Sequence, residues 1–426
     1  MVRGYIKAGL IAAIGIASFS CAKQNINQVS NPTSSGIRLY GNDDGYLLYS
    51  FEPTADGGYM FGGATNASAN NAGQGFIQKT DGSDNLLWSK EYGGPLQDLF
   101  TAVHTTSDGG FIAVGSTISY GLGATRKDYY SDCYMVKTDA NGNQRWKMTF
   151  GDIYTDQFYD VAETPDHGFV AVGGTESATD ESDLYIVKTD ENGTMKWKKI
   201  LFTQYFFNSL ATAVTVNTNG NIAVAGYIVK STFAIDQGTN YPAFMLFDSS
   251  GKALNSGSLH NPFPEYKNWG GLVPAYNNSF RSEKIISRPD GYIFAVNLNT
   301  PVNSLMLFKV NGSDTTTIWR HRYSGLGSAS MNDAVNNSVG GLLISGVTID
   351  PSGKNYFWML NTDANGRKLW ESHTPVPGFN AFAAGAFPVG SNYAIGVSLS
   401  ATHKNLANNF GFLTTDQNGN IVEIKK

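Results

Sequence analysis

The sequence has few cysteines and few charged residues, and both shortages exclude classes of protein. Cysteine occurs only at Cys21 and Cys133, so neither a disulfide scaffold nor a cysteine-rich zinc module fits. Charged residues make up 15% of the chain, against about 25% in ordinary domains, which excludes a coiled coil and a charged disordered chain. The net charge of −5 argues against a dedicated nucleic-acid surface, because such surfaces are basic.

Proline is also scarce, with 14 residues, whereas glycine is abundant, with 48. Abundant glycine without proline excludes a collagen-like or proline-rich disordered chain. Hydrophobic residues make up 41% of the sequence, enough to fill a large core. The composition therefore indicates a globular chain with many glycine-containing turns.

The chain begins with a segment typical of export signals. Arg3 and Lys7 form a basic start, and residues 8–16 form an apolar run too short for a stable membrane span. Residues 1–20 resemble a bacterial lipoprotein signal, which implies lipidation of Cys21, although Ser18 stands where that family usually has leucine. Ser18 and Ser20 also fit a plain secretory cleavage site. We expect an outer-membrane lipid anchor followed by a flexible tether over residues 21–36.

Internal repeats define the rest of the chain. The first repeated element is Asp-Gly-Gly followed by an apolar strand that ends in glycine. Its copies begin at Asp56, Asp108, Asp166, Asn219, Asp290, Gly340 and Gly390. A period of about 56 residues over residues 37–426 indicates a repeat architecture of seven units.

The second repeated element is an apolar strand, then Lys-Thr-Asp, a turn and a tryptophan. The tryptophans of these elements are Trp88, Trp146, Trp197, Trp319 and Trp370. One large ring per repeat suits packing between neighbouring sheets. We therefore interpret these five residues as structural blade anchors and not as catalytic groups.

Each unit contains four runs typical of β-strands, for example residues 100–106, 111–117, 133–138 and 144–150. Four antiparallel strands cannot bury both faces alone, but radial stacking against neighbouring units does so. We predict an all-β fold over residues 37–426, a seven-bladed β-propeller of four-stranded antiparallel blades. Residues 37–41 or residues 421–426 could close the ring, and the sequence leaves both open.

The turns after Lys-Thr-Asp have the form Asp-x-Asn-Gly, as at residues 139–142 and 190–193. Asn-Gly accepts positive φ and closes tight hairpins. A calcium loop would need a twelve-residue segment ending in glutamate, which is absent. The six histidines are not closely spaced, and we expect neither a metal site nor a cofactor. Cys133, in a strand pattern, is interpreted as a small buried hydrophobic residue.

The glycine-to-tryptophan spacing, as from Gly142 to Trp146, resembles the docking motif of quinoprotein-type propellers. The whole repeat is more similar to propellers of exported lipoproteins from Bacteroidetes-type bacteria. This resemblance implies the fold and leaves the activity open. Quinoprotein enzymes carry a vicinal cysteine pair, which this chain lacks.

Long loops between strands two and three, and between blades, are where binding usually occurs on a rigid scaffold. These loops are rich in aromatic and acidic residues. Our candidates for the ligand face are Tyr129, Tyr130, Tyr154, Phe206, Tyr266, Trp269, Asp156 and Glu265. Exposed rings beside polar groups suit sugars or protein partners.

The function we predict is an envelope-anchored lipoprotein whose propeller is a non-catalytic binding platform for a glycan or a partner protein. Two alternatives remain open: a polysaccharide hydrolase or lyase acting in the propeller mouth, and an outer-membrane assembly scaffold. No acidic residue occurs between residues 22 and 42, which favours the periplasmic side over the cell surface. The expected partners are the membrane, a glycan or an envelope protein, and not nucleic acid.

Overall fold

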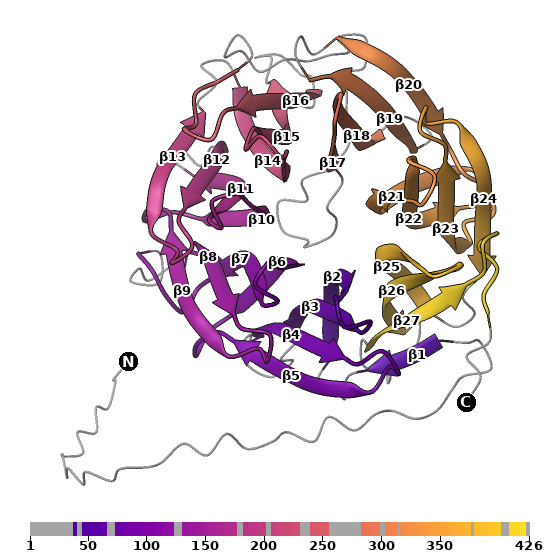
Figure 1. Cartoon of the computed structure of the whole chain (residues 1–426), viewed down its shortest axis with the longest axis horizontal. Helices are drawn as coiled ribbons and strands as arrows, with labels where there is room; N and C mark the ends of the chain where they lie inside the picture. The colour runs from indigo at the N-terminus through magenta and orange to yellow at the C-terminus, as the bar shows by residue number, and fades with distance from the viewer. Residues whose placement is uncertain are drawn as a thin grey trace, which may run out of the picture.

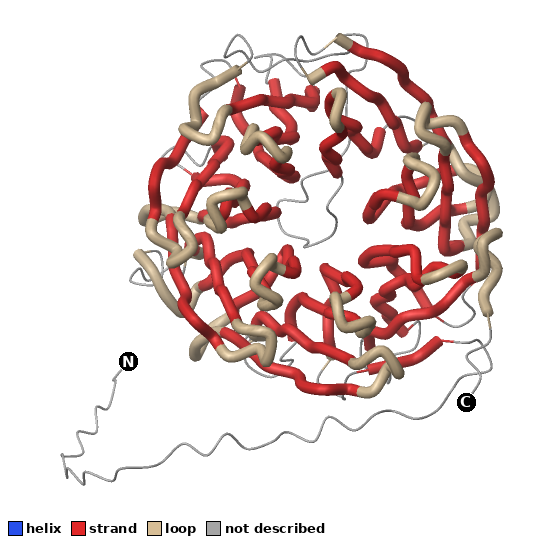
Figure 2. Tube along the Cα trace, viewed as in Figure 1, coloured by secondary structure: helices blue, strands red, loops and turns tan. Residues whose placement is uncertain are grey.

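The computed structural model describes residues 37–40, 45–65, 73–122, 130–176, 182–201, 206–230, 239–254, 283–298, 303–312, 316–375, 379–401 and 409–422. These residues form strands and turns arranged radially in a ring (Figure 2). Within these ranges no helix is long and apolar enough to cross a membrane.

The blades follow one another in chain order around the ring (Figure 1). Blade 1 contains β2 (Tyr46–Pro53), β3 (Tyr59–Thr65), β4 (Gly75–Thr80) and β5 (Leu86–Tyr92). Blade 2 contains β6 (Asp98–Thr105), β7 (Phe111–Thr117), β8 (Asp132–Thr138) and β9 (Gln144–Phe150). Blade 3 contains β10 (Asp156–Glu163), β11 (Phe169–Glu176), β12 (Ser182–Thr189) and β13 (Met195–Leu201). Blade 4 contains β14 (Phe206–Val216), β15 (Ile222–Lys230) and β16 (Thr239–Phe247). Blade 5 contains β17 (Glu283–Arg288), β18 (Gly291–Leu298), β19 (Ser304–Asn311) and β20 (Thr317–Tyr323). Blade 6 contains β21 (Ser328–Asn336), β22 (Leu342–Ile349), β23 (Asn355–Thr362) and β24 (Lys368–Pro375). Blade 7 contains β25 (Phe379–Val389), β26 (Asn392–Ala401), β27 (Asn409–Thr415) and, from the other end of the chain, β1 (Ile37–Tyr40).

The structure is a seven-bladed β-propeller, as the repeat predicts. Neighbouring strands within each blade pair antiparallel, and all of them except β1 do so in chain order. The only parallel pairing among the described strands is a single bridge between Ser182 and Asn208, which joins blades 3 and 4 at one point. In blade 2 the observed strands match the predicted runs to within two residues.

Both ends of the chain contribute to ring closure. β1 pairs antiparallel with β27, with Tyr40 opposite Phe410 and Ile37 opposite Leu413. Ile421 forms a bridge to Thr415 further along the same strand. The outermost position of blade 7 is therefore filled by β1 at one end and by residues 421–422 at the other. The sequence left open which of the two segments closes the ring, and in the structure both pair with β27, each along a different part of it.

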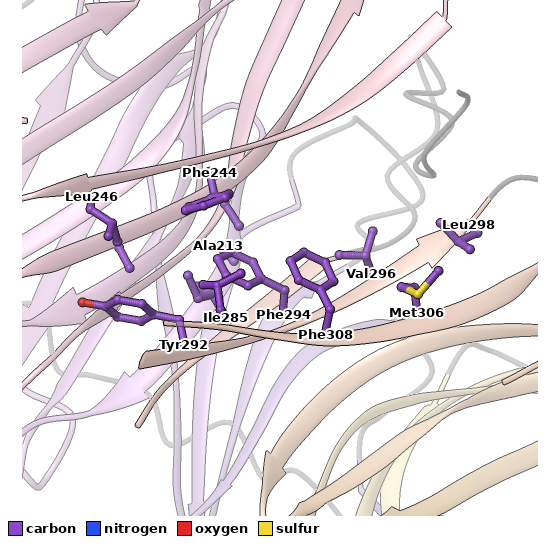
Figure 3. Packing of buried hydrophobic residues seen from close by; sticks show 13 residues of the cluster. Ala213, Phe244, Leu246, Ile285, Tyr292, Phe294, Val296, Leu298, Met306 and Phe308 are labelled. Carbon is purple, nitrogen blue, oxygen red and sulfur yellow. The ribbon is translucent and has the colours of Figure 1, made fainter. Parts of the chain in front are cut away.

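The hydrophobic core lies between blades. The inner faces of neighbouring sheets supply each cluster, so every sheet is buried on both sides. Between blades 4 and 5, Phe294 stacks on Phe308 with ring centroids 4.9 Å apart, and Phe244 packs against Phe294 at 5.1 Å (Figure 3). The middle strands of the blades are mostly apolar for this reason, and all seven residues of β7 and of β8 are buried.

An ion pair within the blade explains why two motif residues recur together. The Asp-Gly-Gly aspartate accepts hydrogen bonds from the Lys-Thr-Asp lysine of the same blade. The pairs are Asp56 with Lys79, Asp108 with Lys137, Asp166 with Lys188 and Asp290 with Lys309. In blade 6 the turn has Val339 and the strand has Asn361, so both partners are lost together.

Each described motif tryptophan contacts the Asp-x-Asn-Gly turn of the next blade or its equivalent. A Cβ on Gly142 would lie 2.7 Å from the Trp88 ring, and Gly142 has φ of 71°. Glycine at this position therefore permits both the turn and the close approach of the ring. The Trp146 indole donates to the Glu191 carbonyl at 2.9 Å, and the Trp197 indole to the Ser249 carbonyl at 3.2 Å. Trp319 and Trp370 lie against Gly366 and Gly419 in the same manner.

Candidate functional site

The propeller has two different faces, set by strand direction. The tight turns after the first and third strands of each blade lie on one face, here called the turn face. The connections between blades and between the second and third strands lie on the opposite face, here called the loop face. Antiparallel order places all connections of one kind on the same side.

Two of the predicted aromatic residues meet on the loop face between blades 2 and 3. The rings of Tyr130 and Tyr154 are 6.0 Å apart at 62°, an edge-to-face contact. Both are half-buried, and Leu122 and Ile153, which lie on the same two connections, are 55% and 42% exposed. Rings and aliphatic side chains are therefore accessible at this place.

The remaining candidates are distributed differently. Tyr129, Glu265, Tyr266 and Trp269 lie outside the described residues, as does Cys21. Phe206 begins β14, and only its backbone is described. Asp156, expected on the ligand face, is instead fully buried.

Asp156 holds the connection between blades 2 and 3. Its Oδ2 accepts the Asp152 amide at 2.9 Å, and its own amide donates to the Ser131 carbonyl at 2.7 Å. Burial raises the pKa of Asp156 to about 7, and the nearby charges of Asp152 and Asp132 add to the rise. The carboxyl group acts as an internal brace and does not face a ligand.

Two further acids have the same role. Asp98 starts β6 as Asp156 starts β10, and it accepts the Gly94 amide at 2.6 Å and the Ser119 hydroxyl at 2.8 Å. Asp132 accepts the Leu122 amide at 3.1 Å. The buried acids of this part of the loop face are therefore used to fix its loops.

A second set of charged residues belongs to the first strands of five blades, which are the innermost strands around the propeller axis (Figure 1). We call Glu52, His104, Asp160, Lys284 and Asp333 the axial cluster. His104 Nδ1 contacts Glu52 Oε1 at 2.5 Å and His104 Nε2 contacts Asp160 Oδ1 at 3.0 Å. Lys284 pairs with Asp333 at 2.9 Å. The first two contacts join blades 1, 2 and 3, and the third joins blades 5 and 6.

The axial carboxylates keep His104 charged. Burial opposes the imidazolium, but Glu52 and Asp160 outweigh it and raise the pKa of His104 to about 9. Burial likewise raises the pKa of Glu52, but His104, the Thr105 amide and Lys284 overcome it, so that the net pKa is lowered. Glu52 and Asp160 also accept the amides of Thr105 and Val214 from neighbouring blades.

A strained residue lies at the edge of this region. His167 has φ of 60°, where the corresponding turn positions in blades 1 and 2 are Gly57 and Gly109. Its Nδ1 lies 3.2 Å from the Ser107 hydroxyl, which also donates to Glu163 Oε1 at 2.5 Å. The serine, histidine and glutamate join blades 2 and 3 on the turn face. The Ser107 hydroxyl donates to Glu163, so this is not a charge-relay arrangement.

The described residues form neither a metal-binding site nor a site with a reactive thiol. Among them, no group of three or more histidine, cysteine, aspartate or glutamate side chains is placed to hold a metal ion. Both ring nitrogens of His104 already contact carboxylates. Cys133 is buried, and burial raises the pKa of its thiol well above the usual value, which makes it a poor nucleophile.

Comparison with known proteins supports the fold. No protein-family model and no curated protein matches this sequence. Solved structures of an ulvan lyase of polysaccharide lyase family PL25 resemble it with TM-scores of 0.55 without ligand and 0.54 with a bound oligosaccharide. In both cases 8% of residues are identical, over 90% of this chain and 97% of the other. The propeller domain of the Trilobed protease from Pyrococcus furiosus gives a TM-score of 0.47 at 8% identity, covering 91% of this chain and 97% of that domain.

The axial cluster is absent from the sequence-based candidates. Glu52, His104 and Asp160 belong to three different repeats. Glu52 and His104 lie four residues before the aspartate of the Asp-Gly-Gly turn, whereas Asp160 lies six residues before it. The available signal was the interruption of apolar inner strands by charged residues. Charged residues in these strands can be assigned to contacts with one another only once the order of the blades around the ring is known.

Proposed function

We propose that this chain is a non-catalytic binding module, a lipid-anchored envelope protein that holds a glycan or a partner protein on its loop face. The observation that carries the proposal is the bracing of the connections beneath Tyr130 and Tyr154. Asp98, Asp132 and Asp156 fix these connections from inside. A surface held in place before the ligand arrives loses little conformational entropy on binding.

The chemistry of the two regions supports binding over turnover. A glycosidase needs two carboxyl groups facing the substrate at a fixed separation. On the loop face the Asp156 carboxyl is fully buried and holds a loop. In the axial cluster, the His104 ring is engaged by carboxylates at both nitrogens, so it has no site for a substrate proton. A hydrolase or lyase is therefore not favoured.

The proposal includes the location of the protein in the cell. A lipid on Cys21 would retain the protein at the outer membrane, on the periplasmic side. The tether of residues 22–36 would span about 20 Å on average as a flexible chain. Replacing Cys21 by serine should move the protein from the detergent phase to the aqueous phase in phase separation. Unchanged partitioning, with no lipid detected on the mature N-terminus, would contradict the anchor.

The test of the loop face uses the mature propeller and a panel of polysaccharides. A ligand that binds the native state raises the melting temperature. We expect one glycan class to do so, and Tyr130→Ala/Tyr154→Ala to lose the rise. Tyr356→Ala, which removes a half-buried ring from the blade 6 side, is the matched control and should keep it.

If no glycan binds, crosslinking in envelope membranes should instead capture a partner protein that depends on Tyr130 and Tyr154. Binding of either kind that is equally strong in the double variant would show that the loop face is the wrong surface.

A further inference from the structure

The outer edges of blades 2 and 3 carry a concentration of positive charge. β9 and β13 are the outermost strands of these two blades and follow one another along the rim (Figure 1). Together they contain five basic side chains and no acidic one, although the whole chain has a net charge of −5. We call Arg145, Lys147, Lys196, Lys198 and Lys199 the outer wall.

Four of these side chains are exposed and arranged in two equivalent pairs. Arg145 and Lys147 flank Trp146, as Lys196 and Lys198 flank Trp197, and all four are exposed. Residues two apart on a strand point to the same side, about 7 Å from each other. Each strand therefore presents two cations in a row to solvent.

Little of this charge is neutralised. Arg145 lies 3.2 Å from Asp108 and Lys196 lies 2.8 Å from Asp190, but both lysine and arginine head groups are exposed, and such pairs are weak. Lys147 lies over the Tyr120 ring at 3.4 Å. Within the described parts of the chain, Lys198 makes no ion pair.

The fold does not require these charges. The position after the motif tryptophan is Lys147 in blade 2 and Lys198 in blade 3, but it is Ser89 in blade 1 and Glu371 in blade 6. All four blades have the same strand pairing at this position. The repeat thus tolerates neutral and acidic residues where blades 2 and 3 have lysine.

We propose that the outer wall binds a linear anionic polysaccharide. Complementary charge is the basis of recognition, and such surfaces bind polyanions with strong salt dependence. The wall follows the convex rim of a ring, so a flat bilayer would touch it along one line only. A flexible chain with acid groups along its length can follow the rim from β9 to β13. This surface includes neither Tyr130 nor Tyr154, so the proposal does not depend on the function proposed for the loop face.

The experiment measures binding of the mature propeller to polygalacturonate and dextran sulfate, with uncharged dextran as the neutral polymer. The test variant is Lys147→Ser/Lys198→Ser, which gives blades 2 and 3 the residue that blade 1 has at Ser89. The matched control is Lys354→Ser/Lys368→Ser, which removes two exposed lysines from blade 6, across the ring. Melting temperatures of all three proteins establish that each is folded.

We expect the wild type to bind both polyanions and not dextran. The test variant should bind about tenfold more weakly, with a shallower dependence on salt, because two exposed charge contacts are lost. The control should bind the polyanions as the wild type does. The Tyr130→Ala/Tyr154→Ala variant should also bind them as the wild type does. If the control lost as much polyanion affinity as the test variant, the effect would come from the overall charge of the protein, and the proposal would be overturned. So would an unchanged test variant, an absence of polyanion binding, or tighter binding to anionic vesicles or single-stranded nucleic acid than to either polysaccharide.

Discussion

His104 should stabilise the ring by an amount that depends on pH. Its imidazolium lies between Glu52 and Asp160, and its side chain is 21% exposed. The pKa rises from 6.5 to about 9 in the folded protein. Because one pKa unit corresponds to about 1.4 kcal/mol, this rise amounts to about 3 kcal/mol of stabilisation.

The direction of the pH effect follows from the sign of the shift. A basic group with a raised folded pKa contributes its full stabilisation below the unfolded pKa of about 6.5. That contribution is lost as the pH rises through about 9, where the imidazolium gives up its proton. The pKa of the Glu52 carboxyl is lowered, so this partner remains charged throughout the range.

The perturbation is His104→Gln, which keeps a polar side chain but cannot carry the charge. At pH 6.5 we expect the variant to be less stable by about 3 kcal/mol, or about 4 °C in melting temperature for a domain of this size. Above pH 9 the difference should shrink to about 1 kcal/mol or less. Denaturant titrations followed by tryptophan fluorescence at pH 6.5, 8 and 9.5 measure it.

The comparison of two proteins at each pH cancels other titrating groups, including Asp156. His321→Gln is the control, because that ring contacts the Asn365 carbonyl at 3.0 Å on the outer rim. It should not reproduce the deficit that we expect for His104→Gln at pH 6.5. A deficit for His104→Gln that is the same at pH 6.5 and 9.5, or is absent at both, would refute the charged state and its carboxylate contacts.

Three further substitutions have defined outcomes. Gln78 is fully buried, and neither of its amide atoms is hydrogen-bonded to any residue that the structure describes, so Gln78→Met should stabilise the protein by about 1 to 2 kcal/mol in a denaturant titration; destabilisation would contradict the unsatisfied amide. His167→Gly removes a side chain from positive φ and should raise stability by about 0.5 to 1 kcal/mol, whereas a loss would mean that the contacts with Glu163 and Ser107 outweigh the strain. Asp156→Asn should gain stability relative to the wild type as the pH rises from 4 through 7, because the folded state binds the extra proton; parallel stability curves would contradict the pKa raised to about 7.

The fold could be predicted because the residues that recur make the same contact in each blade where they occur. Asp56 and Lys79 pair within a blade, and Trp88 lies against Gly142 of the next blade. A contact repeated at a fixed period is visible as a sequence pattern. The closing position was less predictable, because β1 and Ile421 share it and neither carries the motif tryptophan.

The candidate sites could be predicted only in part. Tyr130 and Tyr154 come from loops whose length and composition are visible in the sequence, and the structure brings them together. Asp156 occurs in the same region, but the sequence does not show that the connection folds over it and buries it. The contacts of His104 depend on blade order around a ring, so they follow from the assembled fold alone.

The net charge is a further example of a sequence property that does not show where residues lie in the fold. Asp139 and Asp190 are held in turn-face turns by hydrogen bonds from the backbone amides of their own segments. Lys147 and Lys198 lie on outer strands. The repeat thus places acidic and basic residues at different positions in each blade. The net charge adds both kinds together, so it does not reveal a surface where one sign predominates. A net charge of −5 therefore excludes a ligand that needs a basic protein, but it does not exclude one that needs two basic strands.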